Sequence, residues 1–245
     1  MNQRTMERHT PASVAFKPVP HQLPARERRL REELCLVDRL VHDLRDAFRS
    51  LSRRVRSLGP FQSATRLLLA GVRDAVGCST TALAFAKALA GDIRVLLVDG
   101  NFRRPGLSML LHHSTFGWED ALRGRCSLAH PLQFADPERL VSFLPLSAPI
   151  TKPDEVFHGP ALQAWFSQLC QDYDLLIIDG GPVQQTGYRW ATCADCAILI
   201  CDQKHHDRAK AWDTLEENGI HVLGVIETFA ITPPANQPRR DMPSR

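Results

Sequence analysis

Apolar residues are spaced in two different ways along this chain, and the spacing divides it into two regions. Between Leu30 and Leu58 they recur at alternating intervals of four and three residues, with Arg, Asp and Glu in between. This heptad pattern predicts one long helix over residues 26–58, which a Gly-Pro pair ends. From residue 61 to residue 230, short apolar runs alternate with helical segments, so a folded domain is expected there.

The heptad stripe leaves two interpretations of the long helix open. In the first, the whole helix packs on its own domain. In the second, its first half, Arg26 to Asp43, projects and pairs with another chain. A 3.5-residue period over four repeats favours the second interpretation, in which residues 26–58 mediate self-association or bind a coiled-coil partner.

The apolar runs of the second region lack polar alternation, which is typical of parallel strands covered on both faces. Helices are predicted between them at 79–90, 116–124, 160–171 and 208–217, and the strands themselves at 65–70, 93–98, 140–144, 175–178, 197–201 and 222–226. This alternation predicts an α/β fold, a mainly parallel sheet with helices on both faces. Ligands of such sheets bind at the carboxyl ends of strands, where Gly77, Asp99 and Asp179 fall.

Composition refines this division without changing it. A chain of 245 residues with 44% hydrophobic content supports one domain with extensions. The proline-containing segments 1–25 and 231–245 are expected to be disordered. Residues 1–60 hold 13 Lys and Arg against 7 Asp and Glu, but the acids interleave with the bases, so nucleic acid is not the expected partner.

The chain lacks a run of 18 apolar residues and an apolar signal core at its start, so a cytoplasmic location is expected. Its seven cysteines are expected to be free thiols in a reducing compartment. Cys193 and Cys196 form a lone CxxC, and no spacing in the sequence supplies the two further ligands that a zinc site needs.

The candidate chemistry lies between Thr65 and Pro105, which read as strand, loop, helix and strand. A phosphate-binding P-loop has the pattern G-x-x-x-x-G-K-[ST]. Gly77 and Ser79 match it and Thr80 follows, but Cys78 stands at the lysine position and Val72 at the first glycine. A helix N-terminus with free N–H groups and two hydroxyls still favours phosphate.

Residues 76–111, VGCSTTALAFAKALAGDIRVLLVDGNFRRPGLSMLL, resemble the core of bacterial tyrosine kinases of capsule and exopolysaccharide synthesis. Those kinases belong to the MinD- and ParA-like P-loop ATPases. The resemblance continues through GWEDALRGR, KPDEVF and QDYDLLIIDGGPV and covers roughly residues 44–230. RRPGL is its most specific piece. It implies a P-loop NTPase-like domain over residues 61–230 that works with a membrane polysaccharide co-polymerase or chain-length regulator.

The resemblance also assigns roles to residues. Ser79 and Asp179 would hold Mg²⁺, and Asp99 and Arg103 would be catalytic. ATP would be bound by the residues of the loop and by one residue near the end of the domain: Arg73, Gly77, Cys78, Ser79, Thr80 and Glu227. Arg73 is the candidate replacement for the missing lysine, because some relatives carry a signature lysine at that position.

Three departures from the family pattern affect three different tasks. Cys78 removes a charge-assisted contact worth roughly 1.5–3 kcal/mol, with a larger loss expected in the transition state. Asn101 replaces a second aspartate and cannot act as a carboxylate base. Glu227 replaces an adenine-binding asparagine and offers acceptors only. The two tyrosines, Tyr173 and Tyr188, lie inside the domain, whereas kinases of this family that autophosphorylate usually carry a tyrosine-rich tail.

The sequence therefore predicts an exopolysaccharide or capsule biosynthesis protein that resembles a bacterial tyrosine kinase with a degenerate nucleotide site. The expected role is that of a catalytically impaired regulatory or scaffold partner, associated with the membrane through that partner. An active ATP-dependent protein-tyrosine kinase is the alternative. A MinD- or ParA-type positioning ATPase is disfavoured by RRPGL.

Overall fold

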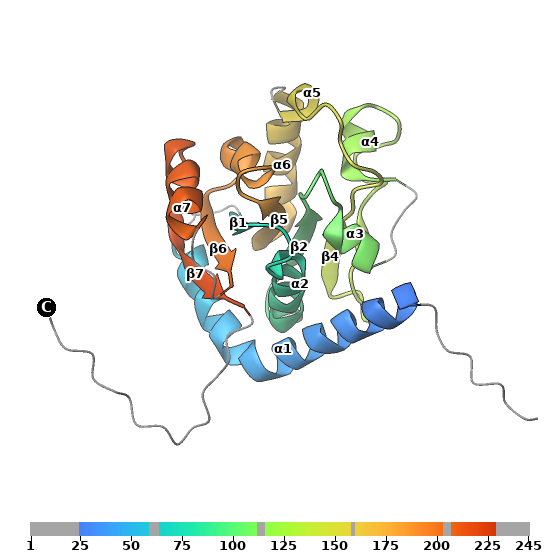
Figure 1. Ribbon diagram of the computed structural model, residues 1–245. Coiled ribbons are helices and arrows are strands. Elements are labelled where there is room, and N and C mark those ends of the chain that lie inside the picture. Colours follow the sequence, from blue (N-terminus) through green and yellow to red (C-terminus); the bar gives the residue numbers. More distant parts are fainter. Residues whose placement is uncertain (1–24, 59–63, 112–115, 158–159, 203–206, 229–245) are drawn as a thin grey trace, which may run out of the picture.

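The computed structural model describes residues 25–58, 64–111, 116–157, 160–202 and 207–228 (Figure 1). The segments 1–24 and 231–245, expected to be disordered, lie outside the described residues. No helix in the described ranges is both long enough and apolar enough to cross a membrane.

One sheet forms the centre of the described part of the chain, with the strand order β3-β4-β2-β5-β1-β6-β7. Its strands are β1 Thr65–Gly71, β2 Val95–Asp99, β3 Gln133–Phe134, β4 Val141–Leu144, β5 Leu175–Pro182, β6 Cys196–Cys201 and β7 Val222–Glu227. All neighbours pair in parallel except β3 and β4. The mainly parallel α/β fold is thereby confirmed. The predicted short strands lack polar alternation because β2, β5 and β6 are buried throughout.

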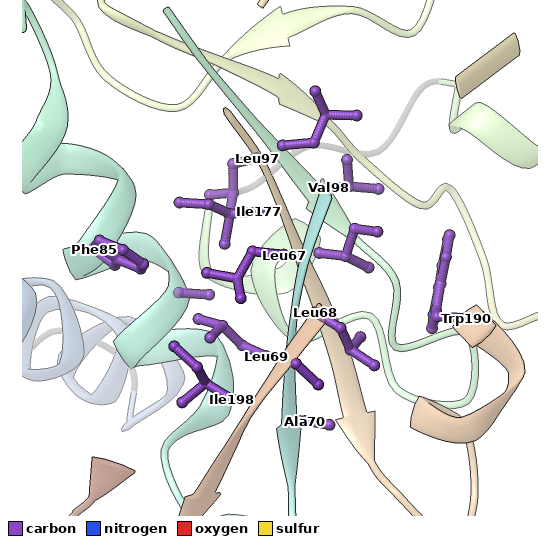
Figure 2. Packing of buried hydrophobic residues seen from close by; sticks show 14 of the residues in the cluster. Leu67, Leu68, Leu69, Ala70, Phe85, Leu97, Val98, Ile177, Trp190 and Ile198 are labelled. Carbon is purple, nitrogen blue, oxygen red and sulfur yellow. The ribbon is translucent and has the colours of Figure 1, made fainter. Parts of the chain in front are cut away.

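Helical segments cover both faces of this sheet. They are α1 Ala25–Arg56, α2 Cys78–Leu89, α3 Gly106–Leu110, α4 Trp118–Leu122, α5 Asp154–Phe157, α6 Pro160–Asp172, the 3-10 helix η1 Gly187–Thr192 and α7 Arg208–Glu217. Figure 2 shows Phe85 of α2 and Trp190 of η1 on opposite sides of the central strands. The sequence pattern did not predict α3, α5, η1 or β3, because each is too short to carry a periodic signal.

The long helix α1 lies across α2 rather than projecting from the domain (Figure 1). Val37 and Val55 are fully buried, and Phe48 stacks on Phe85 with the ring centroids 5.1 Å apart. In the first half of the helix, Asp38 also pairs with Lys87 of α2 at 2.7 Å. The expectation that Arg26 to Asp43 projects is therefore wrong. Spacings of three and four also describe the buried stripe of a surface helix, so they did not separate the two interpretations.

Candidate functional site

The loop between β1 and α2 is held in place by its own chain. Ala75 and Gly77 adopt left-handed backbone angles, with φ values of 57° and 85°, and α2 begins at the next residue. The Arg73 guanidinium forms an ion pair with Asp202, at the end of β6. The Thr228 hydroxyl, just after β7, donates to the Val76 carbonyl oxygen at 2.6 Å. The loop is thus tied to the ends of two strands without a ligand.

Cys78 does not replace the function of a lysine. Its Sγ donates to the carbonyl oxygen of Leu69 at 3.2 Å. Burial raises the pKa of this thiol well above its usual range, and the nearby Asp179 carboxyl raises it further. Cys78 is therefore a neutral thiol, and it supplies neither a positive charge for phosphate nor a thiolate nucleophile.

Asp99 and Asp179 meet at the carboxyl ends of β2 and β5. The two residues are register partners, and both are fully buried. Burial, and then the neighbouring Asp179, raise the pKa of Asp99 to about 8, and burial also raises the pKa of Asp179. Within the described ranges, no lysine or arginine pairs with either acid. Because neither acid has a basic partner in these ranges, the raised pKa values favour a pair that keeps a proton.

The residues expected to bind Mg²⁺ are in direct contact with each other. Ser79 Oγ donates to Asp179 Oδ2 at 2.5 Å. Gly106, the first residue of α3, packs on this contact so closely that a Cβ there would collide with Ser79 Oγ. A hydroxyl and a carboxylate are suitable ligands for Mg²⁺, which needs six oxygens at 2.0–2.1 Å. The donors fit the metal chemically, but Ser79 Oγ and Asp179 Oδ2 bond to each other here and would have to give up that hydrogen bond to hold it.

The next residue of α2, Thr80, is also engaged by an acid. It is 7% exposed, and its hydroxyl donates to Glu33 Oε1 of α1 at 3.0 Å. Both hydroxyls of the expected phosphate-binding turn therefore already donate to carboxylates of the same chain. Sequence reasoning did not anticipate Glu33, because a contact between residues 47 positions apart has no local signal.

The other residues considered for the site are Asn101, Arg103 and Glu227, and they differ in exposure. Asn101 is buried, and its Oδ1 accepts from the Arg104 backbone N–H at 3.2 Å. Arg103 is exposed and forms no ion pair with any residue in the described ranges. Glu227 is half-exposed at the end of β7, with Oε1 3.8 Å from Arg208 Nη1. The structure thus brings Ser79, Asp99 and Asp179 into one site and leaves Arg103 and Glu227 on its surface.

Two indole rings fix the backbone beside the acid pair. Trp118 Nε1 donates to the Asp99 carbonyl oxygen at 2.8 Å, and Trp190 Nε1 donates to the Gly100 carbonyl oxygen at 3.0 Å. The two rings pack against each other and against Phe157. This aromatic cluster, which the sequence reasoning missed, makes the end of β2 rigid.

A second pair of buried acids lies in α4. Glu119 is 1% exposed, and its Oε1 accepts from the backbone N–H groups of Ser147 and Ala148 at 2.9 and 3.1 Å. Asp120 accepts from Gly117 N at 3.1 Å and from Arg125 Nη1 at 2.8 Å. Glu119 therefore holds the loop after β4 through Oε1, while its buried Oε2 has no hydrogen-bond partner among the described residues. Asp120 instead bonds to Gly117 and Arg125.

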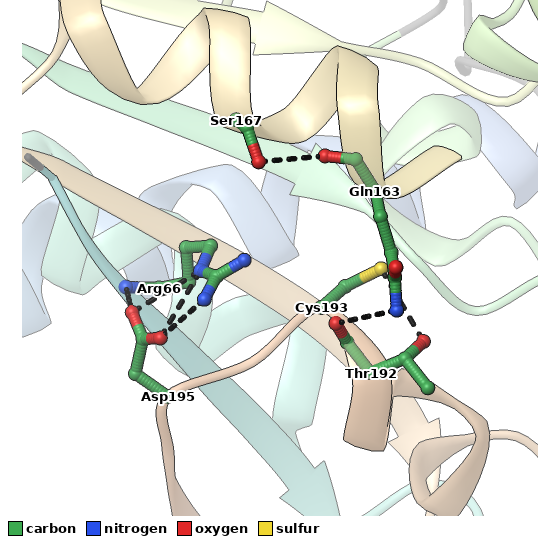
Figure 3. A network of polar contacts seen from close by, with 6 residues as sticks. All are labelled: Arg66, Gln163, Ser167, Thr192, Cys193 and Asp195. Atoms are coloured by element: carbon green, nitrogen blue, oxygen red, sulfur yellow. Dashed lines mark hydrogen bonds and ion pairs between the residues drawn. The ribbon is translucent and has the colours of Figure 1, made fainter. Parts of the chain in front are cut away.

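The lone CxxC has a structural setting. Cys193 and Cys196 are buried, and burial raises the pKa of Cys196 to about 12. Between them, Asp195 accepts from both the backbone and the guanidinium of Arg66, which joins the start of β6 to β1 (Figure 3). Across the described ranges, no group of three His, Cys, Asp or Glu residues could hold a metal ion.

The fold is similar to that of several solved structures. The VpsO kinase domain aligns with a TM-score of 0.67 and 19% identity over 83% of this chain and 98% of that one. The BceF tyrosine kinase domain aligns with a TM-score of 0.65 and 22% identity, over 76% of each chain. Cobyrinic acid a,c-diamide synthase from Mycobacterium smegmatis, with ADP and magnesium, aligns with a TM-score of 0.57 and 19% identity over 67% and 74%. No family model and no curated protein sequence matches the chain. The chain therefore has the fold that these kinase domains and this synthase share.

Proposed function

We propose that this protein is a catalytically impaired regulatory or scaffold partner in exopolysaccharide or capsule synthesis, built on a tyrosine kinase fold. The observation that carries the proposal is the buried pair of Asp99 and Asp179, which has no lysine or arginine partner in the described ranges. Phosphoryl transfer depends on cations placed around the transferred group. A site without one stabilises the transition state poorly.

Two further features support impairment. The Arg73 guanidinium is paired with Asp202, so the candidate replacement for the lysine is already engaged. Ser79 and Asp179 bond directly to each other, so they would have to give up this hydrogen bond to hold Mg²⁺. The polysaccharide context rests on the resemblance of residues 76–111, and the membrane co-polymerase is proposed as the partner on the same ground.

The alternative function is an ATP-dependent protein-tyrosine kinase. It is favoured by the retained glycine, hydroxyl and aspartates at positions 77, 79, 99 and 179, and by neighbours of the same fold that bind ADP and magnesium. In that case the site would open when nucleotide binds, and a basic residue of a partner would supply the missing charge. The two functions differ in whether the isolated chain binds ATP and transfers its phosphate.

Calorimetry with ATP and Mg²⁺ on the purified full chain tests the proposal. We expect no binding heat, no phosphate transfer to a tyrosine peptide, and no effect of Ser79→Ala on partner binding. Cys78→Lys is the matched gain-of-function variant, and we expect it to bind ATP measurably. Robust ATP binding by the unchanged chain, lost in Asp179→Asn, would establish the kinase alternative instead.

A further inference from the structure

The contact between Glu33 and Thr80 places a carboxylate of α1 on the first turn of α2. Thr80 Oγ1 donates to Glu33 Oε1 at 3.0 Å, while the adjacent Ser79 Oγ donates to Asp179 Oδ2 at 2.5 Å. A carboxylate and a phosphate make the same demands on a hydroxyl and on the N–H groups of a helix N-terminus. The Glu33 carboxylate therefore occupies the Thr80 hydroxyl and repels a second anion that approaches this turn.

Glu33 is held in this position by the packing of the whole helix. Val37, one turn further along α1, is completely buried. Asp38 pairs with Lys87 at 2.7 Å, and Phe48 stacks on Phe85. The contacts run along α2 from its first turn to its last, so the register of α1 on α2 fixes Glu33 beside Thr80.

We propose that Glu33 is an internal anion that blocks the phosphate-binding turn, and that α1 and a phosphate group compete for Thr80. The turn becomes available to a phosphate ligand when the start of α1 moves away from α2. The proposal rests on the proposed function, since it gives a second cause for weak nucleotide binding besides the missing lysine. It differs from that cause because it is reversible: a partner that binds α1 would open the turn.

Two variants of Glu33 separate its charge from its hydrogen bond. Glu33→Gln keeps an acceptor for Thr80 and removes the charge, while Glu33→Ala removes both. Glu32→Gln is the matched control, because Glu32 is the exposed neighbour on the same helix and forms no hydrogen bond or ion pair with α2 among the described residues. Binding of ATP and of inorganic phosphate to the full chain is measured by calorimetry, and folding by circular dichroism and thermal midpoint.

We expect both anions to give a measurable binding heat with Glu33→Gln where the unchanged chain gives none, a gain of roughly tenfold or more in affinity, because one repelling charge is gone. Glu33→Ala should bind at least as tightly, and Glu32→Gln should behave like the unchanged chain. If Glu33→Ala does not fold, the folded Glu33→Gln decides the matter. Folded Glu33 variants that bind no better than Glu32→Gln overturn the proposal.

The outcomes for the two proposals are distinguishable. Tight ATP binding and phosphate transfer by the unchanged chain refute the impaired function. If the Glu33 variants still bind ATP more tightly than the unchanged chain, the competition between Glu33 and a phosphate group is supported even though the impaired function is refuted. Conversely, an unchanged chain that ignores ATP, with Glu33 variants that also ignore it, leaves the impaired function in place and removes the role of Glu33.

Discussion

Two buried acids in this molecule, one from each of two acid pairs, have pKa values shifted in opposite directions. Asp99 and Asp179 are fully buried, and the pKa of Asp99 is raised to about 8 by burial and by its neighbour. Asp120, in the α4 pair with Glu119, is 4% exposed, and burial works to raise its pKa as well. Hydrogen bonds from Ser147, Gly117 and Arg125 outweigh burial there, and the pKa of Asp120 is lowered.

The difference shows that the donors around a buried carboxyl, more than its burial, decide its charge. The α4 pair receives N–H groups, a hydroxyl and a guanidinium from the chain, although Glu119 Oε2 is buried without a hydrogen-bond partner among the described residues. The strand-end pair, Asp99 and Asp179, has hydroxyl and N–H donors but no lysine or arginine partner in the part of the chain that the structure describes, and the pKa of both acids is raised. A nucleotide site that had lost its lysine but kept its two aspartates would have this arrangement.

The largest expected effect concerns the pH dependence of stability at the strand-end pair. The unfolded Asp99 carboxyl ionises near its ordinary pKa of 3.8, whereas the folded one keeps its proton up to about pH 8. Between these two pH values, ionisation stabilises the unfolded state but not the folded one. The free energy of unfolding therefore falls as the pH rises from about 4 to about 8. We expect Asp99→Asn to be stabilised relative to the unchanged chain by roughly 5 kcal/mol more at pH 8 than at pH 4.

Urea unfolding at several pH values measures this difference. Asp136→Asn is not a suitable control, because Asp136 accepts bonds from Leu140 N and Val141 N. Glu138→Gln is the matched control, since Glu138 is exposed. An Asp99→Asn curve that runs parallel to that of the unchanged chain from pH 4 to pH 8 would contradict a protonated acid pair.

The α4 pair should respond with the opposite sign. Glu119→Ala leaves the backbone N–H groups of Ser147 and Ala148 without their acceptor in a buried place. Buried donors left unpaired cost about 1–3 kcal/mol, so we expect a loss of about 2 kcal/mol in the free energy of unfolding. Thermal and urea unfolding measure it, with Glu138→Ala as the exposed control. A stabilised Glu119→Ala would show that the two pairs are alike after all.

Sequence reasoning located the strand-end pair and missed the α4 pair for a physical reason. Buried strands with an acid at their ends are local patterns, and parallel strands bring such ends together, so Asp99 and Asp179 could be predicted to meet. Glu119 bonds to a loop 28 residues away, and Arg73 to an acid 129 residues away. Such partners depend on the finished fold. For the same reason the sequence predicted the long helix α1 but not the face of the domain on which it lies.

The smallest expected effect concerns Arg73, which is either a structural partner of Asp202 or the replacement for the missing lysine. If Arg73 is a structural donor, as Arg125 is for Asp120, its loss affects only the ion pair with Asp202. The Arg73 side chain is 44% exposed, and such pairs contribute less than about 1 kcal/mol. Arg73→Gln should therefore lower the thermal midpoint slightly, with Arg123→Gln as the exposed control, and leave the response to ATP and Mg²⁺ unchanged. If Arg73 instead replaces the lysine, the unchanged chain should bind ATP, and Arg73→Gln should lose that binding. Arg73 would then be the cation of the strand-end pair when ATP is bound. The two acid pairs would differ in this respect only in the closed site that this structure shows.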